Sequence, residues 1–197
     1  FTHFEAVRSA EGNVEAAGRD ARRRFFQSLV DEDGFTRIAL AHNREDRVET
    51  FLLHLMRGAG SEGLVSMAPV AGTTVRPLIE ASRGEIESFL RDRGQAWRTD
   101  SSNLDMSFAR NRMRHEIVPR LASLFNTRVV ETLTRTITIL QEEDQWMRQV
   151  ADSWLETQEP DSLDVSQMEK FPLALERRLI RSALQRSGCD LRNLTSE

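Results

Sequence analysis

An imidazole and two carboxylates, those of His42, Asp46 and Glu49, lie within residues 41–50. Such groups hold a nucleophilic amine in place and accept its proton, so the segment indicates acid–base or nucleophile-positioning chemistry. A plainer interpretation stays open for two of them. His42 would then only cap a neighbouring carbonyl, and Asp46 would be a helix N-terminal charge worth about 0.3–1 kcal/mol.

Positive side chains gather in a second segment, residues 110–120, and they are guanidinium groups because Lys170 is the only lysine of the chain. Arg110 and Arg114 are four residues apart and share one face of a predicted helix. This face favours phosphate binding, since guanidinium forks match phosphate oxygens, and a merely solvated face is the alternative. The arginines of residues 19–24 are expected to be solvated. The formal net charge of −4 argues against a uniformly basic nucleic-acid coat.

Strands and helices alternate around the first segment. Residues 36–41 predict a buried strand and residues 48–57 an amphipathic helix, so His42 and Asp46 fall beyond a strand's carboxyl end, where open α/β sheets bind ligands. The remaining predictions are a helix over 13–31, a strand over 73–78, a helix from a Ser82–Glu85 capping box to Gly94, and an extended segment over 95–99. This alternation predicts a doubly wound parallel sheet.

The pattern becomes helical from residue 108 onward. Apolar residues at alternating three- and four-residue steps predict a long helix over 130–154, with its seam interrupted at Asp144. A short extended piece over 161–165 and an amphipathic helix over 171–187 follow. We therefore expect two regions, 1–107 and 108–197, the first α/β and the second all-helical.

Composition excludes several classes of protein. With 197 residues and 39% hydrophobic content the chain can bury a core, and it has no apolar run long enough to cross a bilayer. The single Cys189 excludes an internal disulfide and any site built from two or more cysteines. A cytoplasmic protein with no membrane association is expected, and no residue is assigned to a metal site.

These residues resemble the tRNA(Ile)-lysidine synthetases, a family of PP-loop ATP pyrophosphatases. The resemblance is strong over residues 16–121, and the helical remainder is similar only in position and character. Two blocks carry it, in the family's order and approximate spacing. The first comprises His42, Asp46, Glu49, Thr50, Arg57, Gly58, Gly60, Gly63 and Leu64. The second comprises Arg76-Pro77-Leu78, residues 82–86, Trp97, Asp100, Ser102-Asn103, Arg110-Asn111, Arg114-His115 and Pro119.

The resemblance implies a Rossmann-like, adenine nucleotide α-hydrolase-like fold and a ligase reaction on RNA. The family uses ATP, with Mg²⁺, to adenylate the wobble cytidine of tRNA(Ile) with a CAU anticodon, and free L-lysine then displaces AMP. The helical region would bind tRNA or act as a linker. The implied site comprises His42, Asp46 and Glu49 as catalytic residues, Arg57, Gly58, Gly60, Asp100, Asn103, Arg110 and Asn111 for ATP or substrate, and Arg114 and His115 for tRNA.

Purely structural roles remain as alternatives for several of these residues. Gly58 and Gly60 are equally consistent with a helix C-cap and turn, and Asp100 and Asn103 with a polar turn. The central hypothesis is that the polar side chains from residue 41 to residue 115 converge in one pocket at the sheet's edge.

Two departures from the family pattern are evident. The family's phosphate-binding loop, Ser-Gly-Gly-x-Asp-Ser, is absent from these residues and is expected upstream of Phe1, which predicts that the chain is a fragment. Arg47 stands where the family usually has Gln. A noncatalytic tRNA-binding module and another PP-loop tRNA-modifying enzyme are therefore kept as alternatives. Pairing of the long helix in a homodimer also stays open.

Overall fold

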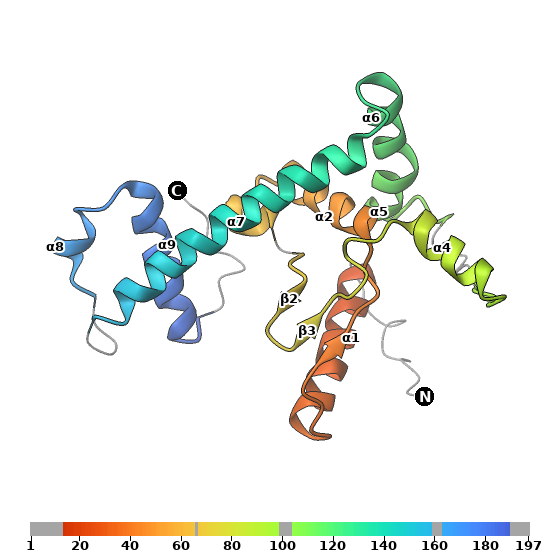
Figure 1. Cartoon of the computed structure of the whole chain (residues 1–197). Coiled ribbons are helices and arrows are strands. Elements are labelled where there is room, and N and C mark those ends of the chain that lie inside the picture. The colour runs from red at the N-terminus through yellow and green to blue at the C-terminus, as the bar shows by residue number, and fades with distance from the viewer. Residues whose placement is uncertain (1–13, 66, 99–103, 159–162, 190–197) are drawn as a thin grey trace. The chain divides into compact units, whose positions relative to one another are not determined.

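The computed structural model describes residues 14–65, 67–98, 104–158 and 163–189 (Figure 1). It divides into two compact units, Phe1–Thr136 and Ile137–Glu197, with the division inside a long helix. In chain order the elements are α1 (Val14–Asp31), β1 (Ile38–Ala39), α2 (Arg44–Met56), α3 (Ser61–Leu64), β2 (Val70–Ala71), β3 (Thr74–Val75), α4 (Arg83–Asp92), α5 (Ala109–Arg112), the π-helical turn η3 (Met113–Ile117), α6 (Val118–Leu124), α7 (Val129–Leu155), α8 (Val165–Met168) and α9 (Leu173–Arg186).

The sheet of the first unit has the strand order β1-β3-β2. β1 and β3 are parallel, and β2 and β3 form an antiparallel hairpin whose turn contains Gly72 at a φ of +58°. Strand β2, which is only two residues long, was not predicted from the sequence. The α/β class is confirmed, whereas the doubly wound arrangement stays a prediction, since the described strands include only one parallel pair.

Helix α2 begins at Arg44, before the expected start at residue 48, because a capping box fixes its first turn. The Asp46 backbone N–H donates to Asn43 Oδ1 at 2.9 Å, and the Asn43 backbone N–H donates to Asp46 Oδ2 at 3.0 Å. Both donors would otherwise lack an intrahelical partner. The apolar face of the helix, which includes Val48 at 0% exposure, is buried. The polar segment after β1 is therefore the helix start itself.

Helix α4 confirms the predicted capping box. The Glu85 backbone N–H donates to Ser82 Oγ at 3.2 Å, and the Ser82 backbone N–H donates to Glu85 Oε2 at 2.7 Å. The helix ends before Gly94, which adopts a φ of +63°. Residues 95–98 form no strand, so the expected extended segment is not confirmed there, and residue 99 lies outside the described residues.

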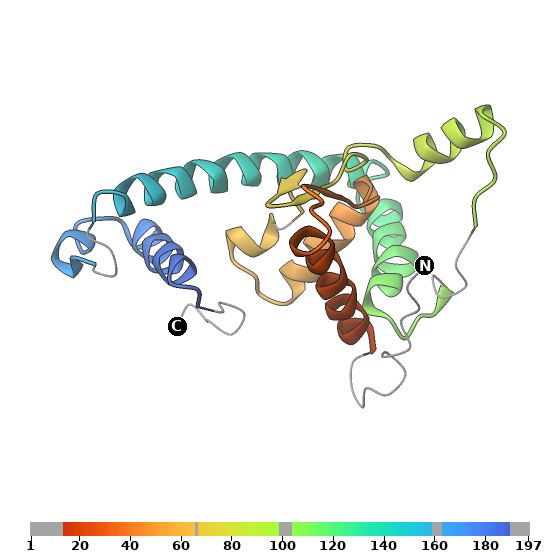
Figure 2. The same ribbon diagram turned by 90° about the horizontal axis from the view of Figure 1, so that it is seen from below.

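Helices α5, η3 and α6 follow one another without a break, and α5 and η3 pack against α2 (Figures 1 and 2). The π-helical turn ends at Ile117, two residues before Pro119, whose nitrogen has no hydrogen to donate to the carbonyl four residues earlier. Because of this packing, residues 109–124 belong to the first compact unit. The division of the chain at 107/108 was predicted from the change to a helical sequence pattern and stays a proposal about function.

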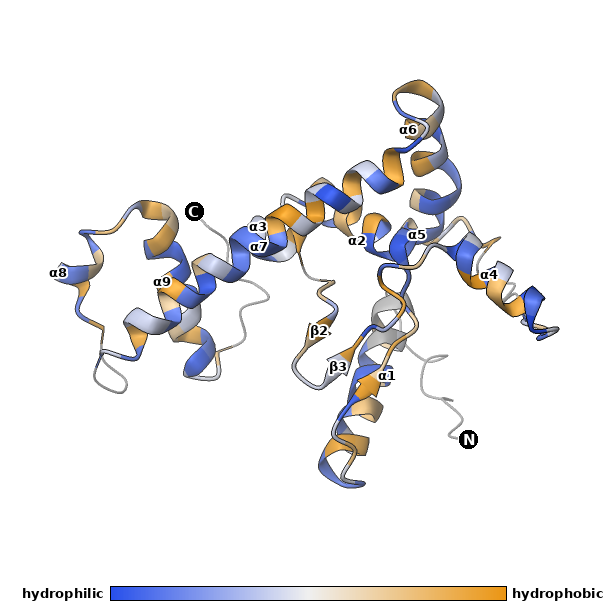
Figure 3. Ribbon diagram, viewed as in Figure 1, coloured by the Kyte–Doolittle hydropathy of each residue, from blue (hydrophilic) through white to orange (hydrophobic). Residues whose placement is uncertain are grey.

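The second unit is helical, with a core of Ala151, Leu155, Met168 and Leu179. The rings of Trp154 and Phe171 meet edge to face beside this core, with centroids 5.8 Å apart. Hydrophobic and hydrophilic residues alternate along α7 and α9, as Figure 3 shows. The bounds of these two helices agree with the predicted helices over 130–154 and 171–187.

The extended piece expected over 161–165 is wrong at its last residue, because Val165 begins α8. Asp164 caps this helix, and its Oδ1 accepts hydrogen bonds from the backbone N–H groups of Ser166 and Gln167. Residues 161 and 162 lie outside the described residues. Within the described ranges, no helix has the length and apolar character that a bilayer crossing requires.

Candidate functional site

Four charged side chains of the first unit meet where α2 packs against α5 and η3. Asp46 and Glu49 lie one turn apart on α2, and Arg110 and Arg114 lie one turn apart across α5 and η3. We call these four residues the acid–arginine cluster. Their side chains are 12%, 2%, 32% and 15% exposed, respectively, so Arg110 is the member most open to solvent.

Each carboxylate of the cluster contacts both guanidinium groups. Glu49 Oε1 and Oε2 accept from Arg114 Nε and Nη2 at 2.6 and 3.0 Å, which is a two-pronged contact. Arg110 donates from Nε to Glu49 Oε2 at 3.1 Å, and its Nη2 lies 3.1 Å from Asp46 Oδ1. Arg114 Nη2 also donates to Asp46 Oδ1 at 2.8 Å. The cluster is thus a closed network of ion pairs.

The electrostatics of the cluster favour the charged state of Arg114. Burial by itself lowers the pKa of Arg114, but the hydrogen bonds and charges of Glu49 and Asp46 outweigh burial and raise that pKa. The second oxygen of Asp46 is held by the Asn43 backbone N–H of the capping box. A local helix cap therefore orients the carboxylate that the two arginines share.

His42 lies just after β1, as the sequence predicted, and is half-buried. Its Nδ1 accepts a hydrogen bond from Arg76 Nε at 3.3 Å. Burial is the main cause that lowers the pKa of His42, the charges of Arg110 and Arg76 lower it further, and Asp46 opposes them. The pKa of the imidazole thus depends on charges of both signs, and the ring is neutral at neutral pH.

Arg47, which replaces the family's usual Gln, is turned away into a separate ion pair. Its side chain is 1% exposed, and Nη1 donates to Glu80 Oε1 at 2.8 Å. Burial lowers the pKa of Arg47, and Glu80 opposes that shift. Two neighbouring residues connect the same helix turn to this region. Arg44 Nε donates to the Glu80 carbonyl, and Glu45 Oε2 accepts from the Arg83 backbone N–H. Arg47 therefore fastens α2 to the segment that leads into α4.

The structure does not bring the predicted glycine loop to the cluster. Arg57 is the C-cap of α2, Gly58 follows it at a φ of +73°, and Gly60 is the N-cap of α3. Eleven residues of helix separate Asp46 from Arg57, which corresponds to roughly 16 Å along the axis. The geometry is that of the helix C-cap and turn, and the assignment of these residues to ATP stays a prediction.

The other predicted site residues are buried, exposed or outside the described residues. Asn111 is buried, and its Nδ2 donates to the Asp105 carbonyl at 2.8 Å, which holds the chain before α5 in place. His115 is exposed on η3. Asp100 and Asn103 lie outside the described residues. Of the polar side chains expected to converge between residues 41 and 115, those of His42, Asp46 and Arg110 do lie together.

Sequence reasoning missed two residues of this site, Arg76 and Asn43. Arg76 follows β3 directly, as part of the Arg-Pro-Leu segment that contributed to the resemblance without a role of its own. Arg76 lies at the end of β3, which is the parallel partner of β1. Ligands bind beyond such strand ends in open α/β sheets, so this position was the signal that could have identified Arg76. Asn43 was hidden because its capping partner is an aspartate rather than the glutamate or glutamine of the usual pattern.

The described residues do not fit a divalent metal ion. Across them, no group of three or more histidine, cysteine, aspartate or glutamate side chains is arranged to hold one. Asp46 and Glu49 form the one carboxylate pair at the site, and both are engaged by arginine. A magnesium ion needs free carboxylate or phosphate oxygens, so we derive no step through Mg²⁺.

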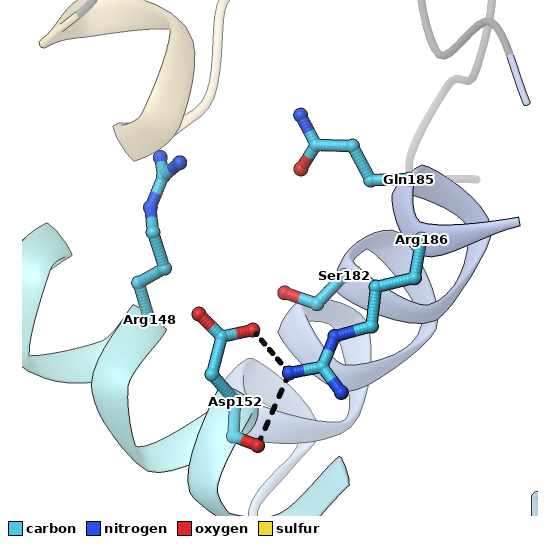
Figure 4. Close-up of a pocket in the computed structure, with 5 residues that line it drawn as sticks. All are labelled: Arg148, Asp152, Ser182, Gln185 and Arg186. Carbon is cyan, nitrogen blue, oxygen red and sulfur yellow. Dashed lines mark hydrogen bonds and ion pairs between the residues drawn. The ribbon is translucent and has the colours of Figure 1, made fainter. Parts of the chain in front are cut away.

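A small polar hollow lies in the second unit between α7 and α9 (Figure 4). Five residues line it: Arg148, Asp152, Ser182, Gln185 and Arg186. Arg186 Nη2 pairs with Asp152 Oδ1 at 3.2 Å, and Arg148 pairs with Asp144 at 3.1 Å. Since both arginines already have carboxylate partners, we assign no ligand to this hollow.

Comparison with known proteins assigns the chain that carries the acid–arginine cluster to a defined family. A family model described as a PP-loop domain matches residues 2–121, more than half of the chain, so the chain belongs to the PP-loop family. The matched segment contains His42, Arg76 and all four cluster residues.

Within that family, the chain is similar to proteins named tRNA(Ile)-lysidine synthase. It is 41% identical to the one from Solibacter usitatus over 93% of this chain and 43% of the relative, and 38% identical to the one from Geobacter sulfurreducens over 93% and 40%. The relative from Thermobifida fusca is 31% identical over 94% of this chain and 58% of its own length. The chain thus spans 43% and 40% of the length of the first two relatives.

Proposed function

We propose that the protein carrying this chain uses ATP to join free lysine to C2 of the wobble cytidine in tRNA(Ile), and that this chain contributes His42 and the acid–arginine cluster to the active site. Membership of the PP-loop family and the names of the relatives support this proposal. The observation that carries it is the cluster itself. Four charged groups, three of them largely buried, meet in the matched segment beside a neutral imidazole.

The reaction has two steps with different requirements. The C2 oxygen of cytidine first attacks the α-phosphorus of ATP and expels pyrophosphate, which concentrates negative charge around the α-phosphate. The ε-amine of lysine then attacks C2, the C2–O bond to AMP breaks, and the amine loses a proton. The first step needs fixed positive groups, and the second needs a carboxylate that positions the neutral amine.

The exposure of the cluster residues divides their roles. Arg110 is the most open of the four, and Asp46 is the more open of the two carboxylates. We assign Arg110 to anionic substrate oxygens and Asp46 to the lysine amine. Glu49 is the least exposed of the four, and Arg114 is less exposed than Arg110 and bonded to both carboxylates. These two act as positioning residues, since they hold the two contact residues in register. Arg114 was expected to bind tRNA, and its contacts with two carboxylates favour the positioning role instead.

The test is transfer of labelled lysine to tRNA(Ile) with a CAU anticodon, catalysed by the full-length protein that contains this chain. We expect incorporation that depends on ATP and releases AMP and pyrophosphate. Binding of the anticodon stem without any lysine transfer would instead support the noncatalytic module. Transfer of sulfur or another group would support a different PP-loop tRNA-modifying enzyme.

Asp46→Ala tests the site within this reaction. We expect the substitution to abolish lysine transfer, because the amine loses its carboxylate and the two arginines lose a shared partner. Asp92→Ala, at the exposed end of α4, is the matched control and keeps full activity. Retained turnover in Asp46→Ala would remove Asp46 from the mechanism.

A further inference from the structure

Arg76 is fixed by three contacts close to the end of β3. Its backbone N–H donates to the Pro69 carbonyl at 2.8 Å, and its Nη1 donates to the Ala68 carbonyl at 2.7 Å. The third contact runs from Nε to His42 Nδ1 at 3.3 Å. The guanidinium group is therefore anchored at one end while its Nε–H points at the imidazole.

The chemistry of the two side chains determines where the His42 proton lies. A guanidinium group has only N–H donors, and burial lowers the pKa of Arg76 without removing its proton at neutral pH. The Nδ1 atom that faces this donor must offer a lone pair. A neutral imidazole with a lone pair on Nδ1 carries its proton on Nε2.

We propose that Arg76 is a positioning residue that holds His42 as the Nε2–H tautomer, so that His42 donates a hydrogen bond to a phosphate oxygen of the substrate and does not accept the amine's proton. The part of this proposal that concerns substrate rests on the proposed function. The tautomer itself does not depend on it. The earlier expectation of an imidazole base is replaced by a hydrogen-bond donor.

The surroundings of His42 favour an anionic partner. The charged groups that act on it are Arg22 of α1, Arg76 after β3 and Arg110 of α5, opposed by Asp46 of α2. Three guanidinium groups against one carboxylate attract a phosphate and disfavour a positive charge on the imidazole. Arg22, which the sequence analysis expected to be solvated only, contributes to this field.

Nitrogen NMR of the histidine ring tests the tautomer in the chain itself. We expect an unprotonated Nδ1 and a protonated Nε2 at neutral pH. In Arg76→Gln the signals become those of a tautomer mixture, and the pKa of His42 rises because a neighbouring positive charge is gone. Arg76→Lys, which restores an obligatory donor, moves both observables back toward the parent. A protonated Nδ1 in the parent, or unchanged His42 signals in Arg76→Gln, would overturn the proposal.

Arg37→Gln is the matched control. Arg37 also donates to a backbone carbonyl of this hairpin, that of Gly72 at 3.2 Å, and has no contact with His42. Its substitution removes an equal charge and leaves the His42 signals unchanged. A shift in Arg37→Gln as large as in Arg76→Gln would mean that the loss of hairpin charge, and not the direct contact, sets the tautomer.

Ligand titration of the full-length protein identifies the phosphate. AMP represents the nucleotide, and an anticodon stem-loop represents the RNA backbone. We expect one of them to shift the Nε2 resonance of His42 and so to name the source of the oxygen. No shift with either ligand would overturn the donor role.

Kinetics of two His42 variants separate a donor from a base. A glutamine amide places an N–H group close to the position of Nε2 but cannot take a proton. Loss of one donor to a developing negative charge reduces turnover about 10²–10³-fold, and we expect this loss in His42→Ala and at least about ten-fold recovery in His42→Gln. Turnover of the parent does not rise as pH passes through the titration of His42. Equal inactivity of both variants would contradict the donor role.

Lysine transfer by the unsubstituted protein is the reference for these kinetics. If it fails, the proposed function fails while the NMR result on the tautomer still stands.

Discussion

Each unit of the molecule buries an ionic group, and the two groups are built differently. In the first unit, two carboxylates and two arginines form the acid–arginine cluster. In the second unit, Asp144 alone, with a side chain 5% exposed, is paired with Arg178 and with Arg148. Arg178 is 8% exposed and comes from α9, whereas Arg148 lies one turn along α7.

The difference supports different roles for the two groups, which we propose. The cluster lies at a helix start beside a strand end, next to a neutral imidazole, and one of its arginines is a third exposed. Asp144 lies in the middle of α7, inside the predicted apolar seam, and its contacts join α7 to α9. A buried pair is weak evidence for stability but fixes how helices align, so we interpret Asp144 as an alignment device and the cluster as a binding site.

The largest expected effect comes from Glu49→Ala. It removes the least exposed carboxylate from two arginines, which keep Asp46 as a partner, so the free energy of unfolding falls by about 3–5 kcal/mol, and lysine transfer is lost. Glu142→Ala on the exposed face of α7 is the control and stays within about 0.5 kcal/mol. Chemical denaturation followed by circular dichroism measures both. Equal stability of the two variants would mean that the cluster is not a closed network.

Asp144→Ala makes the corresponding change in the ionic group of the second unit. It also removes a carboxylate that pairs with the buried guanidinium group of Arg178 and costs about 3–5 kcal/mol, but the loss is confined to the second unit and the kinetics of the folded protein are unchanged. Hydrogen exchange resolved by segment measures where protection is lost. Loss of protection in α2 would show that the two units do not respond separately.

Replacing both partners distinguishes the two groups further. In Asp144→Leu/Arg178→Met the buried charges disappear together, and we expect stability close to that of the parent or above it. The analogous Asp46→Leu/Arg114→Met change also removes a pair but eliminates lysine transfer. Melting temperature and turnover, measured on the same samples, decide the point. Active Asp46→Leu/Arg114→Met protein would make the cluster structural, like Asp144.

The two capping boxes give a smaller, matched effect. Asn43→Ala and Ser82→Ala each remove a cap from the start of a helix and lower the unfolding free energy by about 1 kcal/mol. Only Asn43→Ala lowers turnover, because the same box orients Asp46. Asn43→Ser restores a capping oxygen and with it much of the stability. A turnover loss of equal size in Ser82→Ala would contradict this difference.

The smallest effect is the pH dependence that His42 contributes. Its pKa is lower in the folded protein than in the unfolded chain, so the unfolded state takes up the proton first as pH falls. The free energy of unfolding therefore decreases between about pH 7 and pH 5, and His42→Gln flattens this slope. Denaturation across this range measures it, with the exposed-site variant His115→Gln as control. A slope that His42→Gln leaves unchanged would contradict the lowered pKa.

The sequence predicted the elements whose signals are local. The Ser82–Glu85 box starts a helix within four residues, and the apolar steps of α7 repeat over several turns, so both were found. The cluster was predicted only in part. The shared face of Arg110 and Arg114 follows from their spacing, but their pairing with Asp46 and Glu49 spans more than sixty residues and depends on packing.

The same limit explains the other differences. Asp144 was taken as an interruption of the seam because its partner Arg178 lies 34 residues further along the chain. Strand β2 has two residues, too few for a periodic pattern, and exists through its hairpin with β3. Partners outside the local segment thus decided both the missed strand and the role of the buried aspartate: a neighbouring strand for β2 and a distant arginine for Asp144.

Turnover of Glu49→Gln and Asp144→Asn, measured side by side on the folded full-length protein, tests most directly whether the acid–arginine cluster is the functional site. Each change neutralises one buried carboxylate and keeps its shape. We expect that Glu49→Gln lowers lysine transfer about 100-fold or more while Asp144→Asn keeps the turnover of the parent. Equal turnover in the two variants would contradict it.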